Sequence, residues 1–418
     1  KGPDYIDPMW LGQASGRPCN NLDFYCMTHD EILDTVGQYS AHSDISLIEG
    51  NKGLYDRLDL DRSNSNAAQA KLTRSPVILV LDARGMTRGI APLILGYQAF
   101  DPEIRIAGVI LNQLGGSRHE SKLRAVLEHY TDVRVIGGVH RHAGLEINER
   151  HLGLIPSNEE EASSTFIRHI REIVAAEVDL DGLLAVAGDS PIRHAPASPP
   201  AVVASDRVRI GIARDTAFGF YYPDDLIALE HAGAELVTVN TLSDTALPEV
   251  DGLFIGGGFP ETQMHSLAAN VAMRRQIRSA IEAGLPAYAE CGGLMYLCRS
   301  LQWQEQQHEM VGVIPADCVM HRRPQGRGYV KLRETPDMPW GSPAPAGEIA
   351  AHEFHYSALE NISEPLHYAY DVVRGTGVDG ARDGIIINNL LASYTHMRDT
   401  RQHHWARRFV DFVRHCRR

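Results

Sequence analysis

Apolar and polar positions alternate regularly over two long stretches of the chain. In the first stretch, short β-branched apolar runs predict strands, and the segments between them predict helices. The strands are expected at 76–82, 104–112 and 133–139, and the helices at 91–100 and 119–129. Strands that alternate with helices are typical of a parallel sheet covered by helices. The first part of the chain is therefore predicted to be an α/β domain.

The same alternation restarts after a segment without periodicity. Ser157 followed by Glu160 forms a capping box that predicts a helix reaching about residue 178, and residues 188–206 then concentrate Pro, Ala and Ser. Strands are expected at 207–215, 234–241, 251–258 and 286–291, and helices at 223–233, 292–301 and 401–416, with a last apolar run at 384–396. The pattern thus predicts two α/β domains, 1–187 and 207–418, joined by a linker.

Composition narrows the classes of protein that fit this pattern. A chain of 418 residues exceeds one ordinary core, and 44% hydrophobic with 22% charged residues is typical of soluble globular domains. The net charge of −13 argues against nucleic acid and anionic membranes as partners. No apolar run approaches the roughly 18 residues of a membrane span, and no signal peptide is visible. Six cysteines without a CxxC pair favour a reducing, cytoplasmic location.

The stretch "AECGGLMYL" (289–297) contains a candidate nucleophile, Cys291, between a predicted strand and a predicted helix. A sharp strand-to-helix turn exposes a side chain at the sheet edge, and a helix N-terminus lowers the pKa of a thiol. Gly292 and Gly293 supply the small residues that such a turn needs. The alternative is a buried core cysteine, which is the commoner role of an isolated cysteine.

Two other strand ends supply groups that would support a nucleophile. The run "LFIGGGFPE" (253–261) ends a strand in three glycines, whose backbone N–H groups suit an oxyanion hole. His396 ends the last apolar run, and a base there can reach the same edge of a parallel sheet. His352, Glu353 and His355 in "HEFHYS" compete for the role of base, or have structural roles.

With "AFGFYYPDDL" and "ASYTH", these motifs make the half from about 207 to 418 resemble the triad-type glutamine amidotransferase domain fused to cobyrinic acid a,c-diamide synthases. The resemblance implies a flavodoxin-like sheet. It implies that Cys291 attacks the glutamine amide, that His396 is base and acid, and that N–H groups near Gly257 and Gly292 hold the oxyanion. Many triad amidotransferases carry an acid two residues after the histidine. Arg398 stands there, so the third member is not assigned.

Carboxylates gather in the first half. "KGPDYIDPMW" carries Asp4 and Asp7 around a turn, with a solvated turn as the alternative reading. A short strand is expected to end at Glu49, followed by a loop with Asp56, and Asp82 ends another predicted strand. Carboxylates at the carboxyl ends of strands are where nucleotide-binding sheets hold Mg²⁺.

These stretches resemble the synthetase domain of the same family, which is related to dethiobiotin-synthetase-like P-loop ligases. The resemblance implies that acidic and aromatic residues line the site for ATP, Mg²⁺ and the tetrapyrrole carboxylate: Asp4, Tyr5, Asp7, Glu49 and Asp56, with Glu49 and Asp82 on the metal. It implies amidation of acetate side chains a and c of a corrin or sirohaem-type ring through an acyl phosphate. The partners are then small molecules, and a homodimer stays open.

The first half departs from this family in two ways. No GxxxxGK[ST] occurs, and the chain begins with Lys1, so we expect the P-loop to precede it and this chain alone to bind ATP poorly. Arg57 and Arg62 stand where the family usually has glycine.

Three alternatives therefore stay open at this point. The first is a non-catalytic or regulatory tetrapyrrole-binding homologue that has lost ATP use, and the second is a cysteine hydrolase on the same turn. The third lies within the ligase family itself and is an enzyme of the sirohaem-amidating subgroup. "EGNKGLYD" and "THMRD" look closer to that subgroup.

Overall fold

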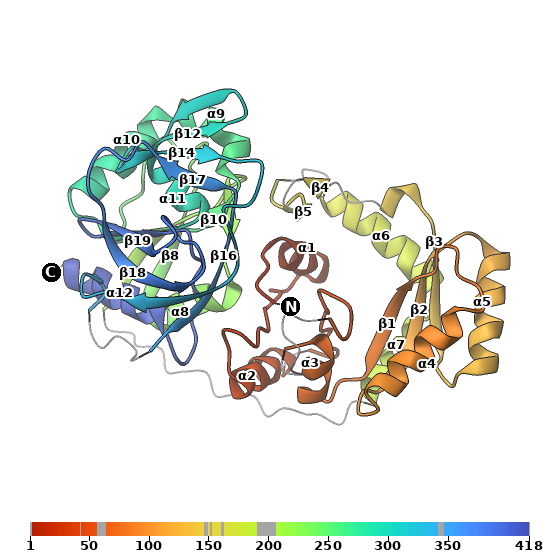
Figure 1. Ribbon diagram of the computed structural model, residues 1–418. Helices are drawn as coiled ribbons and strands as arrows, with labels where there is room; N and C mark the ends of the chain where they lie inside the picture. Colours follow the sequence, from red (N-terminus) through yellow and green to blue (C-terminus); the bar gives the residue numbers. More distant parts are fainter. Residues whose placement is uncertain are drawn as a thin grey trace. The chain divides into compact units, whose positions relative to one another are not determined.

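The computed structural model describes residues 2–41, 43–56, 64–145, 149–150, 153–159, 163–189, 206–341 and 347–417. The chain divides into two compact units, which are described separately (Figure 1). Unit 1 comprises Lys1–Gly2, Trp10–Arg17 and Thr28–Ser198, and unit 2 comprises Pro3–Met9, Pro18–Met27 and Pro199–Arg418. Two N-terminal segments thus group with unit 2. The expected linker lies almost entirely outside the described residues, and the domain boundaries at 187 and 207 stay a prediction.

Unit 1 is built around a small parallel sheet of order β1-β2-β3. Its elements, with a first helix that begins in unit 2, are α1 (Ile6–Ser15), α2 (His29–Ser40), α3 (Asn66–Leu72), β1 (Val77–Asp82), α4 (Ile90–Phe100), β2 (Ile106–Leu114), α5 (Ser117–Tyr130), β3 (Val135–His140), β4 (Glu149–Arg150), β5 (Gly153–Leu154), α6 (Ser163–Glu177) and α7 (Leu180–Gly188). The alternation predicted for 76–139 is confirmed.

Two predictions for unit 1 are wrong in detail. Residues 45–50 form no strand, and Leu47 is 82% exposed, so the run before Glu49 has no sheet to join. The helix expected from Ser157 begins at Ser163 within the described residues, although part of its capping box lies outside them. A short apolar run and a capping motif alone do not fix these elements, because tertiary contacts decide them.

Unit 2 contains a nine-stranded mixed sheet of order β16-β15-β18-β19-β20-β11-β9-β6-β8, a smaller four-stranded sheet and a two-stranded ribbon of β7 and β10. Its elements are β6 (Val208–Ala213), β7 (Phe218–Phe220), α8 (Pro223–His231), β8 (Ala234–Val239), β9 (Gly252–Ile255), β10 (Gly257–Gly258), a 3₁₀ turn (Pro260–Gln263), α9 (Met264–Ala269), α10 (Val271–Glu282), β11 (Ala287–Glu290), α11 (Gly292–Leu297), β12 (Cys298–Trp303), β13 (Gln306–Glu309), β14 (Ile314–Met320), β15 (Gly326–Glu334), β16 (Ile349–His355), β17 (Ser357–Glu360), β18 (His367–Arg374), β19 (Arg382–Ile387), β20 (Leu390–Ser393) and α12 (Trp405–Cys416).

Strands β8, β6, β9, β11 and β20 run parallel, with β8 at the edge, and apolar side chains cover both faces of β6, β9, β11 and β20. One core joins alternate strand residues to helices α10 and α11, and the other joins the remaining ones to α8 and α12. Strands buried on both faces read as continuous apolar runs, which explains why these strands were visible in the sequence. The sheet brings the carboxyl ends of β9, β11 and β20 to one edge.

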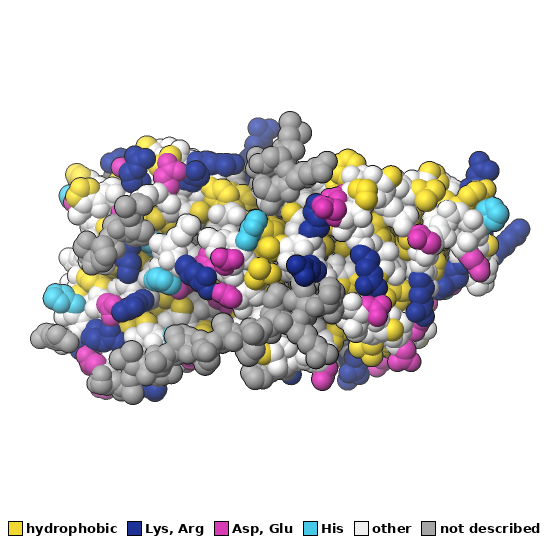
Figure 2. All heavy atoms as spheres, turned by 90° about the horizontal axis from the view of Figure 1, so that it is seen from below, with side chains coloured by type: hydrophobic (Ala, Val, Ile, Leu, Met, Phe, Trp, Pro, Cys, Tyr) yellow, Lys and Arg dark blue, Asp and Glu magenta, His cyan; other side chains and the backbone are white. Residues whose placement is uncertain are grey.

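The apolar run 384–396 differs from its expected form. It folds back as an antiparallel pair, β19 and β20, and the second strand ends three residues before His396. Helix α11 is also shorter than expected, because strand β12 begins at Cys298. Among the described residues no helix combines the length and apolar character needed to cross a membrane. On the face drawn in Figure 2, acidic and basic side chains of the described residues are interspersed.

Candidate active site

Cys291 lies at a sharp turn between strand β11 and helix α11. Its backbone has φ 46° and ψ −97°, a positive-φ conformation that lies outside the regions a residue with a side chain normally adopts. Its N–H donates to the Ser393 carbonyl at 2.7 Å, which ties the turn to the end of β20. Such strain at a turn is a feature of functional sites and agrees with the elbow predicted from the sequence.

The resting thiol of Cys291 is held protonated rather than activated. Burial, with the nearby Glu261 carboxylate, raises the pKa of Cys291 well above its ordinary value, and the Gly292 N–H offsets only part of this. The thiol donates to the Phe354 carbonyl at 3.9 Å, a contact that needs the S–H proton. The sequence predicts that the helix N-terminus lowers the pKa of this thiol. Burial outweighs that effect, because Cys291 is only 7% exposed. A base has to remove this proton.

The glycines beside the turn allow two backbones to approach closely. A Cβ atom on Gly293 would lie 2.1 Å from the Ile255 carbonyl oxygen, and one on Gly258 would lie 2.0 Å from that of Ala217. A Cβ atom on Gly292 would lie 2.9 Å from the Gly258 nitrogen. The Gly-rich end of β9 and the Cys291 turn are thus packed against each other, and only glycine fits. The oxyanion roles of Gly257 and Gly292 stay a prediction.

His396 reaches this edge of the sheet from the segment after β20. A Cβ atom on Gly257 would lie 2.6 Å from its Cε1, so the imidazole rests on the glycine run. Its Nδ1 lies 3.4 Å from Oε2 of Glu290, the residue directly before Cys291, and both side chains are 4% exposed. The turn of Cys291 and the ring of His396 thus both lie against the glycine run after β9, and the roles of these residues stay a prediction.

The competing residues of "HEFHYS" are engaged in packing. The ring of His352 stacks on His396 with 5.0 Å between centroids, and burial, with His396 and Arg398 nearby, lowers its pKa well below the ordinary value. Nδ1 of His355 donates a hydrogen bond to the Ser357 carbonyl at 2.8 Å, and the His355 ring stacks on Tyr394. Glu353 accepts the Thr376 and Gly377 N–H groups. These contacts favour structural roles for His355 and Glu353.

A buried carboxylate fixes the turn that carries His396. Asp383, which is fully buried, accepts hydrogen bonds from the Ser393 hydroxyl at 2.8 Å and from the N–H groups of Tyr394 and Thr395 at 3.0 Å. It also accepts the Gly384 N–H at 2.8 Å. Together with the antiparallel bridge between His396 and His352, whose N–H and carbonyl groups exchange hydrogen bonds, these bonds set the course of the segment after β20.

The N-terminal segment of unit 2 places Tyr5 against the candidate base. Tyr5 is 8% exposed, and its ring centroid lies 5.2 Å from that of His396, 4.5 Å from Tyr222 and 5.3 Å from Phe220. Burial, with Tyr222 and Glu290 nearby, raises its pKa well above the ordinary value. Its expected place at the synthetase site stays a prediction, and the contact with His396 was not foreseen.

Arg398, at the position where many triad enzymes have an acid, serves another purpose. Its guanidinium is 5% exposed, donates to Asp224 at 3.0 Å and to the Asn21 carbonyl, and lies over the Tyr222 ring. It therefore anchors the segment Pro18–Met27 of unit 2.

Comparisons with known proteins agree with this geometry. Residues 209–402 match the family model of the CobB/CobQ-like glutamine amidotransferase domain, and residues 25–148 match that of an AAA domain. A cobyrinate a,c-diamide synthase of Magnetococcus marinus is 42% identical over 97% of this chain and 88% of its own length. The chain belongs to the cobyrinate a,c-diamide synthase family. Enzymes of that name from Methanosarcina acetivorans and Archaeoglobus fulgidus are 41% and 40% identical, over 94% and 98% of this chain and 84% and 89% of theirs.

Family membership confirms the resemblance seen in the sequence, the α/β fold and the class of glutamine-hydrolysing carbon–nitrogen ligase. The roles of individual residues stay predictions. In the synthetase part, Asp4 and Asp7 fall in unit 2, whereas Glu49, Asp56 and Asp82 fall in unit 1. Arg57 and Arg62 lie outside the described residues.

The expected metal ligands do not form a ready site. Asp82 ends β1 as predicted, but its carboxylate is held by Arg84 at 2.5 and 2.8 Å, which lowers the pKa of Asp82. Within the described ranges no three His, Cys, Asp or Glu side chains cluster as metal ligands do.

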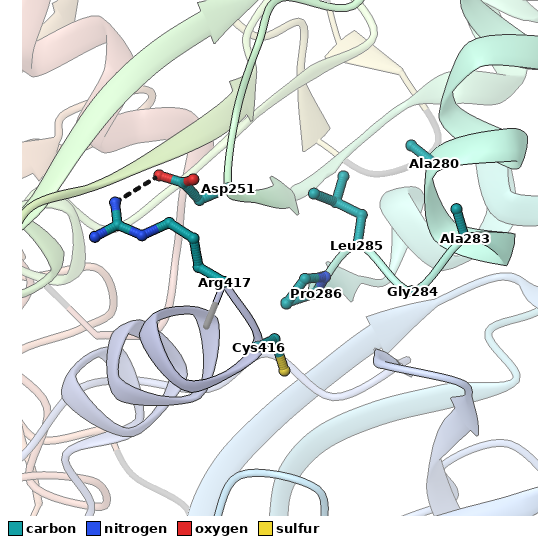
Figure 3. Close-up of a pocket in the computed structure, with 8 residues that line it drawn as sticks. All are labelled: Asp251, Ala280, Ala283, Gly284, Leu285, Pro286, Cys416 and Arg417. Atoms are coloured by element: carbon teal, nitrogen blue, oxygen red, sulfur yellow. Dashed lines mark hydrogen bonds and ion pairs between the residues drawn. The ribbon is translucent and has the colours of Figure 1, made fainter.

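A pocket on unit 2 lies away from Cys291. Its lining residues are Asp251, Ala280, Ala283, Gly284, Leu285, Pro286, Cys416 and Arg417 (Figure 3). Pro286 directly precedes β11, so the pocket lies at the amino ends of the strands, whereas Cys291 follows the carboxyl end. Arg417 pairs with Asp251 at its rim at 3.3 Å (Figure 3). This pocket does not include Cys291, His396 or Glu290 among its lining residues.

Sequence reasoning missed three residues that the geometry makes important: Glu290, Asp383 and Tyr5 as a neighbour of His396. A signal existed for the first, because a carboxylate in a strand buried along its whole length needs a partner. Asp383 stands directly before a run of apolar residues, but its donors come from a strand ten residues further along, which a local pattern does not reveal.

Proposed function

We propose that the protein amidates the a and c acetate side-chain carboxylates of a corrin or sirohaem-type tetrapyrrole, with glutamine as the source of ammonia and ATP as the activating substrate. The observation that carries the proposal is the buried group of Cys291, His396 and Glu290 at one sheet edge, in a chain related over nearly its whole length to cobyrinate a,c-diamide synthases.

The glutaminase half-reaction uses the residues of unit 2. His396 takes the proton of the Cys291 thiol, and the thiolate attacks the glutamine side-chain carbonyl. Backbone N–H groups near Gly257 and Gly292 stabilise the oxyanion. His396 then returns the proton to the leaving nitrogen, so that ammonia departs and a thioester remains. Water hydrolyses the thioester to glutamate and regenerates the thiol.

The synthetase half-reaction activates the other substrate. A tetrapyrrole carboxylate attacks the γ-phosphoryl group of ATP, which yields an acyl phosphate and ADP. Ammonia then displaces phosphate to give the amide. Asp4, Tyr5, Asp7, Glu49 and Asp56 are the proposed lining of this site, and Glu49 and Asp82 the proposed contacts to Mg²⁺. The match of residues 25–148 to an AAA domain supports nucleotide use.

Removing the nucleophile tests the division of labour. In a form of the protein that includes a P-loop, Cys291→Ala should abolish glutamine-dependent amidation and leave ammonia-dependent amidation intact, because ammonia bypasses the glutaminase site. His396→Ala should give the same split, whereas His355→Ala should impair glutamine use less. Glutamate release and product mass are measured side by side. Loss of both activities in a folded Cys291→Ala protein would contradict the proposal.

The identity of the tetrapyrrole is tested separately. Cobyrinic acid and a sirohaem-type ring are each supplied with glutamine and ATP, and the products are examined by mass spectrometry. The names of the curated relatives favour cobyrinic acid. Exclusive amidation of the sirohaem-type ring would assign the protein to the other subgroup.

A further inference from the structure

Glu290 is a buried carboxylate that the proposed reaction has not yet used. It ends strand β11, directly before Cys291, and is 3% exposed. Its Oε1 accepts the Tyr288 hydroxyl at 2.6 Å and the Met397 N–H at 2.9 Å. Its Oε2 faces Nδ1 of His396 at 3.4 Å. One oxygen is therefore anchored by two donors, and the other is directed at the imidazole.

The imidazole of His396 lacks another acceptor at that nitrogen. Its Nδ1 is buried and has no hydrogen-bond partner among the described residues at the geometry of a normal bond. The rings of His352 and Tyr5 pack against the imidazole ring, so they do not accept a hydrogen bond from Nδ1 at its edge. The nearest carboxylate oxygen is therefore that of Glu290, and a loose contact in a resting site tightens when the substrate binds.

We propose that Glu290 is the positioning residue of the glutaminase site and takes the part of the third triad member, which Arg398 cannot take. A carboxylate at Nδ1 keeps the proton on that nitrogen, so Nε2 stays free to accept the Cys291 proton. The inference rests on the proposed function, since it needs His396 as the base.

The charge balance of the site supports this assignment. When His396 accepts the thiol proton, a cation forms in a buried site. Arg398, two positions later in the sequence, already places a buried guanidinium nearby. Arg398 is paired with Asp224. The Glu290 carboxylate offsets the new charge, and its two anchoring hydrogen bonds fix it before the reaction starts.

Glu290→Gln provides the decisive test. The amide oxygen can keep the bonds from Tyr288 and Met397, but the amide nitrogen would donate to Nδ1 of His396 and shift the ring proton to Nε2. We expect kcat for glutamine hydrolysis to fall at least about 100-fold with little change in KM, since a wrong tautomer in a triad costs up to about 10⁴-fold.

Glu334→Gln is the matched control, because Glu334 is a buried carboxylate that faces a different histidine, with Nε2 of His403 at 3.4 Å from its Oε1. It should lower kcat less than about fivefold, whereas a purely structural role of Glu290 would make both variants equally poor. If Glu290→Gln does not fold, Glu290→Asp, which withdraws the carboxylate by one methylene, should still reduce kcat more than tenfold. A folded Glu290→Gln protein with normal kcat overturns the inference, whereas glutaminase activity in Cys291→Ala overturns the proposed function itself.

Discussion

The stability of the turn that carries His396 should depend on one side chain, Asp383. This carboxylate is fully buried and accepts hydrogen bonds from the Ser393 hydroxyl and from three backbone N–H groups, those of Gly384, Tyr394 and Thr395. The substitution Asp383→Ala removes all four acceptor contacts at once and leaves the donors inside the protein, where water cannot replace the carboxylate.

The size of the effect follows from these contacts. Thr395 N–H keeps a second acceptor, the Ser393 hydroxyl at 3.0 Å, so three donors are left without a partner. A buried donor without a partner costs about 1–3 kcal/mol, and the turn relaxes in part, so we expect a loss of about 3–5 kcal/mol in the free energy of unfolding. For a domain of this size that corresponds to a fall of about 10 °C in melting temperature.

The activity should fall as well, because a displacement of the base by about 1 Å costs on the order of 100-fold in rate. Melting temperature and glutamine hydrolysis are measured on the same protein, the latter well below the melting point of the variant. Asp379→Ala is the control: Asp379 also accepts two backbone N–H groups and pairs with Arg382, but it is 29% exposed, so its loss should cost about 1 kcal/mol or less. Equal melting temperatures for the two variants would refute the reasoning.

Two further predictions concern the rings around His396. The pKa of His352 is lowered in the folded protein, first by burial, so an unfolded chain binds a proton that the folded one does not as pH falls below about 6.5. This contribution to stability is complete above pH 6.5 and is lost below it by up to about 1.4 kcal/mol per pH unit, and denaturant unfolding of His352→Gln should show a shallower acid slope. Tyr5→Ala should cost about 3 kcal/mol and reduce glutamine hydrolysis, whereas Tyr5→Phe should stay within about 1 kcal/mol; melting curves in which the two behave alike would contradict the packing argument.

The parts of the fold that could be predicted are those whose information is local. Strands β2, β3, β6, β9 and β11 are largely buried and mostly apolar, and β1 is an apolar run although its Val80 is 62% exposed, so runs of this kind are visible in the sequence. The sequence pattern predicts no individual strands within residues 298–374. Strands β14 to β18 of this region are antiparallel in part and have one exposed face, so their signal is weaker and their pairing depends on distant partners.

The candidate site shows the same division. Cys291 with its two glycines, the glycine run and His396 could be found because each stands at the end of an apolar run. Their pKa values could not be predicted: the thiol of Cys291 was expected to be activated by a helix N-terminus, but the depth of the site, visible only in three dimensions, raises its pKa instead. The proposed glutaminase reaction therefore depends more on a base, the role proposed for His396, than the elbow motif alone suggests.

The grouping of N-terminal segments with unit 2 changes how the two halves of the chain should be understood. Tyr5 contacts His396, the Asn21 carbonyl accepts from Arg398, and the Tyr25 hydroxyl donates to the Val330 carbonyl at 3.1 Å. All three contacts lie inside unit 2, although the residues stand more than 300 positions before their partners. A fragment that begins after the Pro/Ala-rich segment would therefore lack part of the wall around the candidate base and leave the buried Arg398 without one of its acceptors. The amidotransferase unit is continuous in space but not in sequence, because it includes Pro3–Met9 and Pro18–Met27.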